Sequence, residues 1–443
     1  MRVTAKRLVL FLGTFLFTAL TITLMLYDLR VQTARSLVFD WLSQNNIHLC
    51  AFRKLPMVFE HGDRYYYIVW ETTCAMSTPS LEWWTDLDSS AKEFRHIIEP
   101  WYKRIDGNHH RYSVILGPVE SYFQVHYKIG NYRLSVKQYT INRHKINETV
   151  QILVMADNQN KASTFRSVLA SSQRMYSRRR KTPDTIMHVG DTIQSINKLS
   201  DWQTHFFAPM EDSGGPQHTI PTIFVPGNHD HDKRRGPDNK NCYMDMYHGI
   251  YSTDGLSSST AVNGSYHQFY HSVSLGNACI IVLDAECPSK DQSKFLIREL
   301  QSNAFKNARF RIVAVHIPPY VEFWDSYAWE HKGEKHWGEH VRLEYDTLFR
   351  QHGVDLVISG HQHNYQRSTI RRSENSTAMD TITYAIVGGA GGSLDLERVE
   401  DWKMYNVTYL GHHYVALDID DSVLRWTAYN VAGSIVDQFS IFR

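Results

Sequence analysis

The sequence predicts a layered α/β domain that follows a small antiparallel β-sandwich, and two changes in hydrophobic pattern along the chain support this. Between residues 51 and 145, short segments of aromatic and β-branched residues alternate with turn signals such as Gly107-Asn108 and Gly130-Asn131, which is typical of antiparallel strands. From residue 148 onward, apolar runs typical of buried strands alternate with helical segments, as they do in α/β proteins. At 443 residues the chain is long enough for two or three such units.

The expected elements follow in chain order. In the sandwich we predict strands at residues 64–72, 81–85, 111–116, 122–129 and 132–139. In the α/β unit, residues 150–155 are a bare apolar run, and residues 161–177 place Phe165, Val168 and Leu169 on one helical face. Further helices are expected at residues 293–301 and 339–351, the second ended by Gly353, and alternating strands at residues 414–442. Residues 51–145 contain no cluster of ligand-type residues, so we interpret them as a structural domain.

The first 27 residues differ from the rest of the chain. Arg2, Lys6 and Arg7 precede residues 8–27, a run of 20 residues without a charged side chain. At about 1.5 Å per residue, a helix of that length roughly matches the hydrocarbon core of a bilayer. Because no small-residue cleavage pattern follows it, we predict an uncleaved signal anchor, with a cleaved signal peptide as the alternative.

The basic residues before this segment predict its orientation. Positive charge favours the cytoplasmic side, so residues 1–7 are expected in the cytoplasm and residues 28–50 as a stem. The remainder would then lie in the lumen or outside the cell, which describes a single-pass type II membrane protein, or a secreted one if cleavage occurs. Four Asn-x-Ser/Thr sequons fit the secretory pathway, at Asn147, Asn263, Asn375 and Asn406.

The five cysteines fit the same compartment. They show no C-x-x-C spacing, which argues against a zinc ribbon or a redox motif. In an oxidising lumen we expect Cys50 to pair with Cys74, and Cys242 to pair with either Cys279 or Cys287. The alternative is that several of them are buried free thiols.

Composition excludes some classes of protein. A hydrophobic content of 42% with 21% charged residues is that of a globular protein. The formal net charge is +1, so the overall balance calls for neither nucleic acid nor an acidic surface as partner. We interpret the basic run at residues 177–181 as a solvated loop.

Five apolar runs each end in side chains of the kind that bind metals. In an open α/β sheet, side chains just beyond the carboxyl ends of the strands converge on one crevice, so we expect these residues at one edge of one sheet. A single such strand end would indicate a turn or a core histidine, but five in succession indicate a metal centre. Carboxylate, amide oxygen and imidazole donors without a thiolate suit zinc, manganese and iron. The residues are Asp157, Asp191, Asn228, His316, His361 and His363.

At these positions the chain resembles the calcineurin-like metallophosphoesterase superfamily, whose pattern D-x-[HG], GD, GNH[DE], a lone His and G-H-x-H occurs here in order. HIPPY from His316 and GHQHNYQR at residues 360–367 are similar to motifs of the purple acid phosphatase branch. GGAGG at residues 388–392 and the ending IVDQFSI resemble its C-terminal strands. The resemblance implies a four-layer αββα metallophosphoesterase sandwich over residues 148–443, preceded by a fibronectin-type-III-like β-sandwich at residues 51–145.

The resemblance also implies a role for each residue. A metal-bound hydroxide would attack phosphorus in a phosphate ester, with two metal ions (Fe, Zn or Mn) about 3.5–4 Å apart. Asp157 and His363 would hold the first metal and Asp191 would bridge both. His229 would protonate the leaving group or bind phosphate, with Asp230 orienting its ring; the alternative is that His229 is only a neighbour of a ligand. The second metal would be held by Asn228, His316 and His361.

Two positions depart from that family pattern. Gln194 stands where purple enzymes have a metal-binding tyrosine, so we predict no purple charge-transfer band. Gln159 stands at the last position of D-x-[HG], where it would either supply an amide oxygen to the first metal or contact substrate. The pocket wall is expected within residues 320–340, which include His331, although ordinary loop packing would also explain that stretch.

These observations predict an acid-phosphatase-like hydrolase of small phosphate esters that acts outside the cytoplasm. The alternative is a catalytically silent lumenal or cell-surface binding module on the same fold. A nuclease with the same chemistry would need a basic groove, and the sequence has no evident one.

Overall fold

The computed structural model describes most of the chain after residue 49, namely residues 50–61, 64–86, 95–106, 109–119, 124–130, 138–141, 149–195, 199–231, 269–286, 289–324, 338–373, 380–399 and 404–443. The predicted cytoplasmic tail, anchor and stem lie outside these residues. Within the described ranges, no helix combines the length and the apolar character needed to cross a bilayer.

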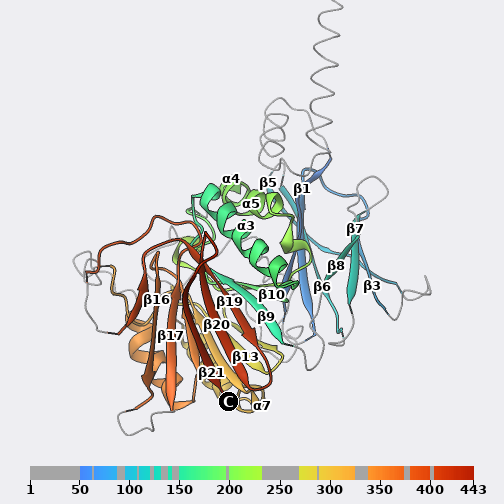
Figure 1. Ribbon diagram of the computed structural model, residues 1–443. Helices are drawn as coiled ribbons and strands as arrows, with labels where there is room; N and C mark the ends of the chain where they lie inside the picture. Colours follow the sequence, from blue (N-terminus) through green and yellow to red (C-terminus); the bar gives the residue numbers. More distant parts are fainter. Residues whose placement is uncertain are drawn as a thin grey trace, which may run out of the picture.

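The largest sheet has ten strands and runs through both predicted units (Figure 1). Its central strands β9, β10 and β11 are parallel, and β19 is antiparallel to β9. In order across the sheet the strands are β21 (Ile435–Phe442), β20 (Val423–Asn430), β19 (His413–Ile419), β9 (Val150–Met155), β10 (Thr185–His188), β11 (Thr222–Phe224), β1 (Phe52–Glu60), β2 (Tyr66–Thr72), β6 (His109–Leu116) and β5 (Trp101–Asp106).

A second sheet of seven strands belongs entirely to the C-terminal unit. Strands β13, β14, β15 and β17 are parallel, and antiparallel strands flank them. In order the strands are β12 (His271–Leu275), β13 (Ala278–Leu283), β14 (Phe310–Val315), β15 (Leu356–Ser359), β17 (Thr381–Val387), β16 (Tyr365–Arg371) and β18 (Val407–Tyr409).

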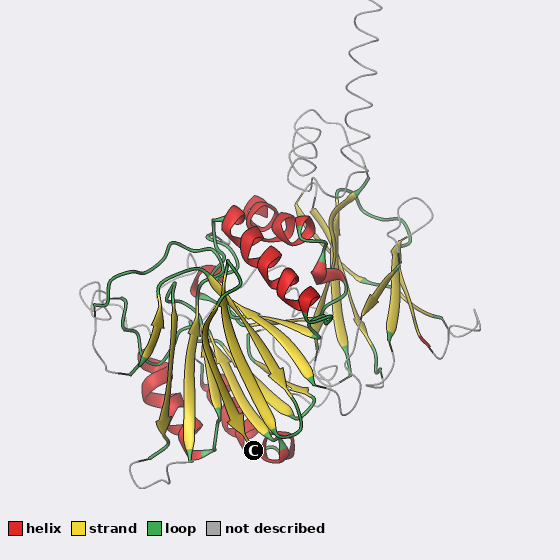
Figure 2. Ribbon diagram, in the orientation of Figure 1, coloured by secondary structure: helices red, strands yellow, loops and turns green. Residues whose placement is uncertain are grey.

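The two sheets pack face to face between two layers of helices (Figure 2). Their shared core contains Ile152 and Val154 from the first sheet and Ile280 and Ile312 from the second. The outer face of the first sheet is covered by α3 (Ala162–Arg178), the π-helical turn Trp202–Phe207 and α5 (Ala208–Asp212). The outer face of the second is covered by α6 (Lys290–Leu300), α7 (Asn303–Asn307), the π-helical turn Val341–Tyr345 and α8 (Asp346–Gln351). This is the expected αββα order of layers.

The N-terminal strands form a sandwich of their own. Strands β1, β2 and β6 face a four-stranded sheet made of β4 (His96–Ile98), β3 (Ser80–Thr85), β7 (Val125–Gly130) and β8 (Tyr139–Ile141). The core between them includes Trp70 and Tyr112 on one side and Leu81 and Tyr127 on the other. The sandwich continues into the α/β unit because β1 pairs in parallel with β11, Phe59 opposite Thr222. The specific likeness to fibronectin type III stays a prediction.

The predicted elements match the structure closely where their signals are local. Helix 161–177 is α3, and the predicted helix 293–301 begins earlier, at Lys290, because the Ser289 hydroxyl caps it by accepting from the Gln292 N–H. The predicted helix 339–351 is a π-helical turn followed by α8, and Gly353 takes a φ of 73° just after it. The Cys50–Cys74 disulfide is present.

Strand β1 had no clear signal in the sequence because its charged residues are buried. Lys54 is fully enclosed and its Nζ lies 2.8 Å from the Glu71 carboxylate, while Arg111 Nε donates to the same carboxylate at 2.7 Å. Burial of such charges is sustained by pairing, which depends on neighbouring strands and leaves no mark on the local pattern. Cys279 is buried in β13; Cys242 and Cys287 lie outside the described residues.

Candidate metal centre

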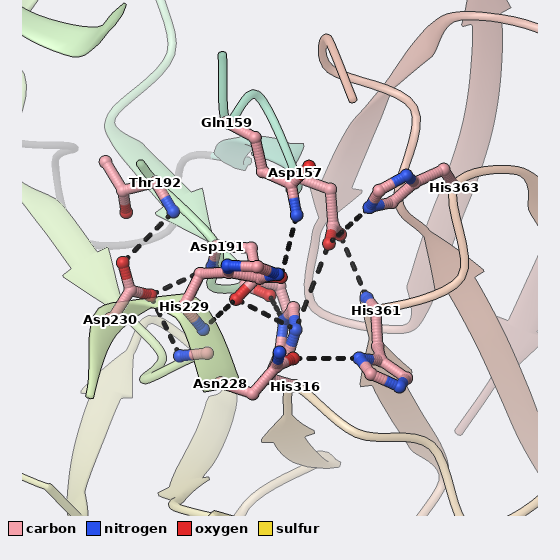
Figure 3. Close-up of polar contacts among 12 residues, drawn as sticks. Asp157, Gln159, Asp191, Thr192, Asn228, His229, Asp230, His316, His361 and His363 are labelled. Atoms are coloured by element: carbon pink, nitrogen blue, oxygen red, sulfur yellow. Dashed lines mark hydrogen bonds and ion pairs between the residues drawn. The ribbon is translucent and has the colours of Figure 1, made fainter. Parts of the chain in front are cut away.

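The six predicted metal ligands converge at one end of the paired sheets (Figure 3). Asp157, Asp191 and Asn228 follow β9, β10 and β11 of the first sheet, whereas His316 follows β14 of the second. The turn after β15 carries the other two ligands, His361 and His363. The prediction of one edge of one sheet was therefore wrong, because both sheets have parallel strands and strand ends alone do not reveal which sheet holds each strand.

Backbone strain is concentrated at this end of the sheets. Seven of the described residues that are not glycine have positive φ, and four of them lie here, namely Asp157 (62°), Gln159 (38°), Asp191 (54°) and His361 (71°). A non-glycine residue in this conformation costs roughly 1–2 kcal/mol, and such residues cluster at functional sites. Hydrogen bonds hold the turns, since Asp157 N–H donates to the Gly190 carbonyl at 3.0 Å and His361 N–H to Asp157 Oδ2 at 3.0 Å.

Two glycines allow the strand ends to approach each other. A Cβ on Gly227 would lie 2.2 Å from the Asp191 nitrogen, and one on Gly190 would lie 2.4 Å from His316 Nδ1. Contacts that short do not occur between real side chains and their neighbours. The glycines before Asp191 and Asn228 are therefore needed for close approach.

The acids and imidazoles form two buried groups that share one residue. One group contains Asp191, His316 and His361, and the other contains Asp157, Asp191 and His363; within each, the possible ligand atoms lie within 4.8 Å of one another. Asn228 joins the first of these, since its Oδ1 lies 2.9 Å from His361 Nδ1. The division, with Asp191 common to both, is the one that the family resemblance implies.

The chemistry of these donors fits bound cations. Asp157 Oδ1 and His316 Nε2 are buried and make no hydrogen bond, although Oδ1 lies 3.5 Å from His363 Nε2 and 3.9 Å from His316 Nε2. Burial lowers the pKa of His316, but Asp191 and Asp157 outweigh that effect and raise it to about 10. Carboxylates enclosed at this depth need positive charge beside them, which protons or metal ions can supply.

His229 and Asp230 do not interact as predicted. His229 Nδ1 lies 2.9 Å from the Gln194 carbonyl oxygen, which orients the ring. Asp230 instead accepts backbone N–H groups of Gly227, Asp191 and Thr192 at 2.9, 2.9 and 3.2 Å. Burial and the neighbouring Asp191 raise the pKa of Asp230 to about 7. The buried carboxyl therefore fixes the turns after β10 and β11. The prediction that Asp230 orients the His229 ring was wrong because neighbours in sequence need not have side chains in contact.

The two glutamines that replace family residues both reach the centre. Gln159 Nε2 donates to Asp191 Oδ2 at 3.1 Å, and Gln194 Nε2 lies 3.3 Å from His229 Nδ1. Each amide thus contacts a neighbouring side chain of the site, and neither contact is to Asp157 or His363. We expected Gln159 either to supply an oxygen to the first metal or to contact substrate. The structure gives it another role, as a hydrogen-bond donor to the carboxylate of Asp191.

Comparison with known proteins follows the same residues. Residues 150–365 match the sequence model of the calcineurin-like phosphoesterases. This segment is a calcineurin-like phosphoesterase domain. It contains all six predicted ligands, His229 and both substituted glutamines.

Proteins similar to this chain include one whose name calls it probably inactive and one that is named for its metal pair. A protein of Arabidopsis thaliana named a probable inactive purple acid phosphatase is 25% identical over 280 residues, 59% of this chain and 44% of its own length. An Fe(3+)-Zn(2+) purple acid phosphatase of the same plant is 33% identical over 132 residues, 29% of this chain and 24% of its own. The matched segments therefore span less than half the length of these curated relatives.

A solved structure shares the fold. A purple acid phosphatase from yellow lupin (Lupinus luteus) seeds superimposes with a TM-score of 0.67 at 15% identity, covering 88% of this chain and 74% of that chain. The likeness extends beyond residues 150–365 and includes most of the described molecule.

The centre also depends on residues that the sequence had not singled out. Asn158 Nδ2 donates to the Thr192 carbonyl at 2.8 Å and its Oδ1 lies 2.7 Å from His188 Nε2, so it ties the turn after β9 to β10. Asp395 accepts from the His363 N–H at 2.7 Å and from the Trp324 indole N–H at 2.8 Å. Asn158 lies between two ligand-type residues, which was a usable signal; Asp395 lies in a polar loop and gave none.

The predicted pocket wall is described only in part. The Trp324 ring centroid lies 5.0 Å from that of His361, so this residue borders the centre. Tyr320 instead bonds to Asp346 at 3.3 Å, away from it. His331 lies outside the described residues, as do the sequons at Asn147, Asn263 and Asn375. Asn406 is exposed, as a glycan acceptor must be.

Proposed function

We propose that this protein is a dinuclear-metal-dependent phosphatase that hydrolyses small phosphate monoesters. The observation that carries the proposal is the pair of buried ligand groups joined at Asp191. A carboxylate is the natural bridge because two cations about 3.5–4 Å apart need an anion between them. The donor types suit iron, zinc or manganese.

The bound cations would activate a water molecule and neutralise charge on the phosphoryl oxygens. The protein side chains do the rest of the positioning. The Asp191 carboxylate is fixed by the backbone N–H of His229, which donates to its Oδ1 at 2.9 Å. His316 Nδ1 lies 2.6 Å from the Val189 carbonyl, so that nitrogen carries the hydrogen and Nε2 is turned to the centre.

His229 is the residue placed to handle a proton or a phosphate oxygen. Its side chain is 28% exposed, whereas the ligands are buried, and its Nε2 lies 4.0 Å from Asp191 Oδ2. Since Nδ1 faces the Gln194 carbonyl, Nε2 is the nitrogen that would meet a substrate. In the protonated ring this atom donates a hydrogen bond to phosphate or a proton to the leaving oxygen.

The proposed cellular setting is the lumen of the secretory pathway or the cell surface, with the chain held by residues 8–27. The Cys50–Cys74 disulfide supports an oxidising compartment. The exposed sequon at Asn406 is compatible with it.

The second candidate is a binding module that keeps the fold without turnover. The glutamines at 159 and 194 favour it, because both replace residues of the family pattern inside the centre. Similar plant proteins that are named probable inactive purple acid phosphatases are compatible with it.

Phosphatase activity on an aryl phosphate, measured together with metal content on the purified full-length chain, decides between the two. Turnover that Asp191→Asn and His361→Ala abolish, while the surface variant Asp212→Asn retains it, would support the phosphatase. A folded chain that shows neither metal nor turnover from pH 4 to 9, with zinc, manganese and iron supplied, would leave the binding module.

A further inference from the structure

We infer that the two metal positions are unequal: the position formed by Asp191, Asn228, His316 and His361 (the second site) holds its ion tightly, and the position formed by Asp157, Asp191 and His363 (the first site) exchanges its ion. The inference rests on the proposed dinuclear centre and deepens it. The inference is specific to this chain because it depends on Gln159 and Gln194, which replace residues of the family pattern.

The second site has a full set of oriented donors. Its four residues match the coordination number that zinc commonly takes in proteins. His316 Nδ1 is held by the Val189 carbonyl at 2.6 Å, and His363 Nδ1 of the first site is held by the Ser393 carbonyl at the same distance of 2.6 Å. Contacts of this kind fix the ring orientation in both sites. The difference between the sites therefore lies in the number of donors.

The first site has three donors, and neither glutamine completes it. Gln159 is buried beside the site, but its amide nitrogen donates to Asp191 Oδ2, an oxygen of the shared carboxylate. The Gln194 amide lies against His229 Nδ1. Both amides are neutral, and their nitrogen atoms contact Asp191 and His229 rather than Asp157 or His363. Neither glutamine therefore adds charge to the first site, whose charged or imidazole donors are Asp157, Asp191 and His363.

Solvent access points in the same direction. His363 is 8% exposed, compared with 0% for His316 and 1% for His361. The first site therefore has the ligand most open to water. Its two carboxylates, Asp157 and Asp191, still attract a cation, so the site is expected to fill when free metal is plentiful and to empty when it is scarce.

This arrangement makes turnover respond to the concentration of free divalent metal. The residues of both sites would be needed to hold the two cations that the proposed phosphoryl chemistry requires. The second site alone would hold one of them. The chain would then bind a phosphate ester without hydrolysing it efficiently, which joins the two candidate functions as two metal states of one protein.

The test measures metal bound to the purified full-length chain after prolonged dialysis against a weak chelator, for the wild type, His361→Ala, His363→Ala and Asp191→Asn. The wild type and His363→Ala should each keep about one ion per chain, and His361→Ala and Asp191→Asn should lose it. Circular dichroism of each variant checks that it is folded.

The outcomes separate this inference from the proposed function. Two ions retained equally by the wild type, or loss in His363→Ala but not in His361→Ala, would overturn the inequality and leave the dinuclear phosphatase intact. No ion under any loading condition would overturn the phosphatase itself. A second test needs no variant: zinc is titrated into the wild type and binding is monitored through the rise in thermal denaturation temperature. Two binding phases are expected, with affinities at least about tenfold apart. A single phase would contradict the inference.

Discussion

The two facing sheets contribute different chemistry to the centre. The first sheet supplies oxygen donors, Asp157, Asp191 and Asn228, from the ends of β9, β10 and β11. The second sheet supplies only imidazoles, His316, His361 and His363, from the ends of β14 and β15. Each buried ligand group contains members from both, so neither sheet makes a metal site alone. The centre is a consequence of how the sheets pack.

Backbone hydrogen bonds join the sheets near the centre, in addition to the side-chain contacts of the ligands. Ala390 N–H, beyond β17 of the second sheet, donates to the Ala156 carbonyl at 2.9 Å, and Gly392 N–H donates to the Asp157 carbonyl at 2.6 Å. His413 of β19 adds to them, since its N–H donates to the Gly389 carbonyl at 3.1 Å. The different contributions of the sheets can be tested at three places: the oxygen side, which is the first sheet; the imidazole side, which is the second sheet; and the junction, which is formed by these hydrogen bonds between them.

The largest effect is expected on the oxygen side, at Asp230. Asp230→Ala leaves the backbone N–H groups of Gly227, Asp191 and Thr192 without their buried acceptor, and we expect a loss of about 3–5 kcal/mol in the free energy of unfolding. Urea denaturation measures it. The control Asp212→Ala removes a half-exposed carboxylate bonded to Arg166 and should cost less than about 1 kcal/mol. Equal losses would refute the role assigned to Asp230.

The junction should weaken in acid through His413. Burial lowers the pKa of this ring to about 4, below about 6.5 in the unfolded chain. The unfolded state then binds the extra proton between pH 6.5 and 4, so stability falls as pH falls through this window, by on the order of 3 kcal/mol in full. Stability measured against pH should show a smaller acid slope in His413→Phe. An unaltered slope in His413→Phe would contradict the prediction.

A smaller effect is expected at a clamp farther from the metals. The Asp437 carboxylate of β21 accepts a hydrogen bond from Tyr365 Oη at 2.6 Å. It also accepts from Arg367 Nε and from Arg367 Nη2, the latter at 3.0 Å. These contacts tie the first sheet to β16 of the second. A double-mutant cycle of Asp437→Asn and Arg367→Met should give a coupling of about 1–2 kcal/mol. The exposed pair Asp420 and Arg425 lies within one sheet and should give about 0.5 kcal/mol or less. If the coupling energy between Asp437 and Arg367 is no larger than that between Asp420 and Arg425, the clamp does not join the sheets.

The smallest effect is expected on the imidazole side, at Trp324 beside His361. Because its ring lies 5.0 Å from that of His361, the indole would offer an aromatic surface to the leaving group of a bound ester, and aromatic contacts are worth about 0.5–1.5 kcal/mol. In Trp324→Leu we expect KM for an aryl phosphate to rise several-fold with kcat little changed, and KM for an alkyl phosphate to stay the same. Trp101→Leu, in the sandwich, is the control. Equal changes for both substrates would argue against a contact with the leaving group.

The sequence was informative wherever the signal was local. The 3.6-residue period located α3, the apolar runs located the strands that precede the predicted ligands, and the order of motifs indicated the family. Strand β1 was missed because Lys54 is buried by pairing with Glu71, a residue on the neighbouring strand. The role of Asp230 was misassigned because its partners, Asp191 and Thr192, are nearly forty positions away.

The sequence by itself determined which atoms are available at the centre: two aspartates, one asparagine and three histidines, each placed beyond a buried strand, and two glutamines where the family has other residues. Only the tertiary structure decided that oxygen and imidazole donors come from opposite sheets, that Asp191 is shared, and that the glutamine amides face Asp191 and His229. The reason is that strand ends are set by local hydrophobic pattern, whereas distances between ligands are set by packing between segments more than a hundred residues apart, such as Asp157 and His361.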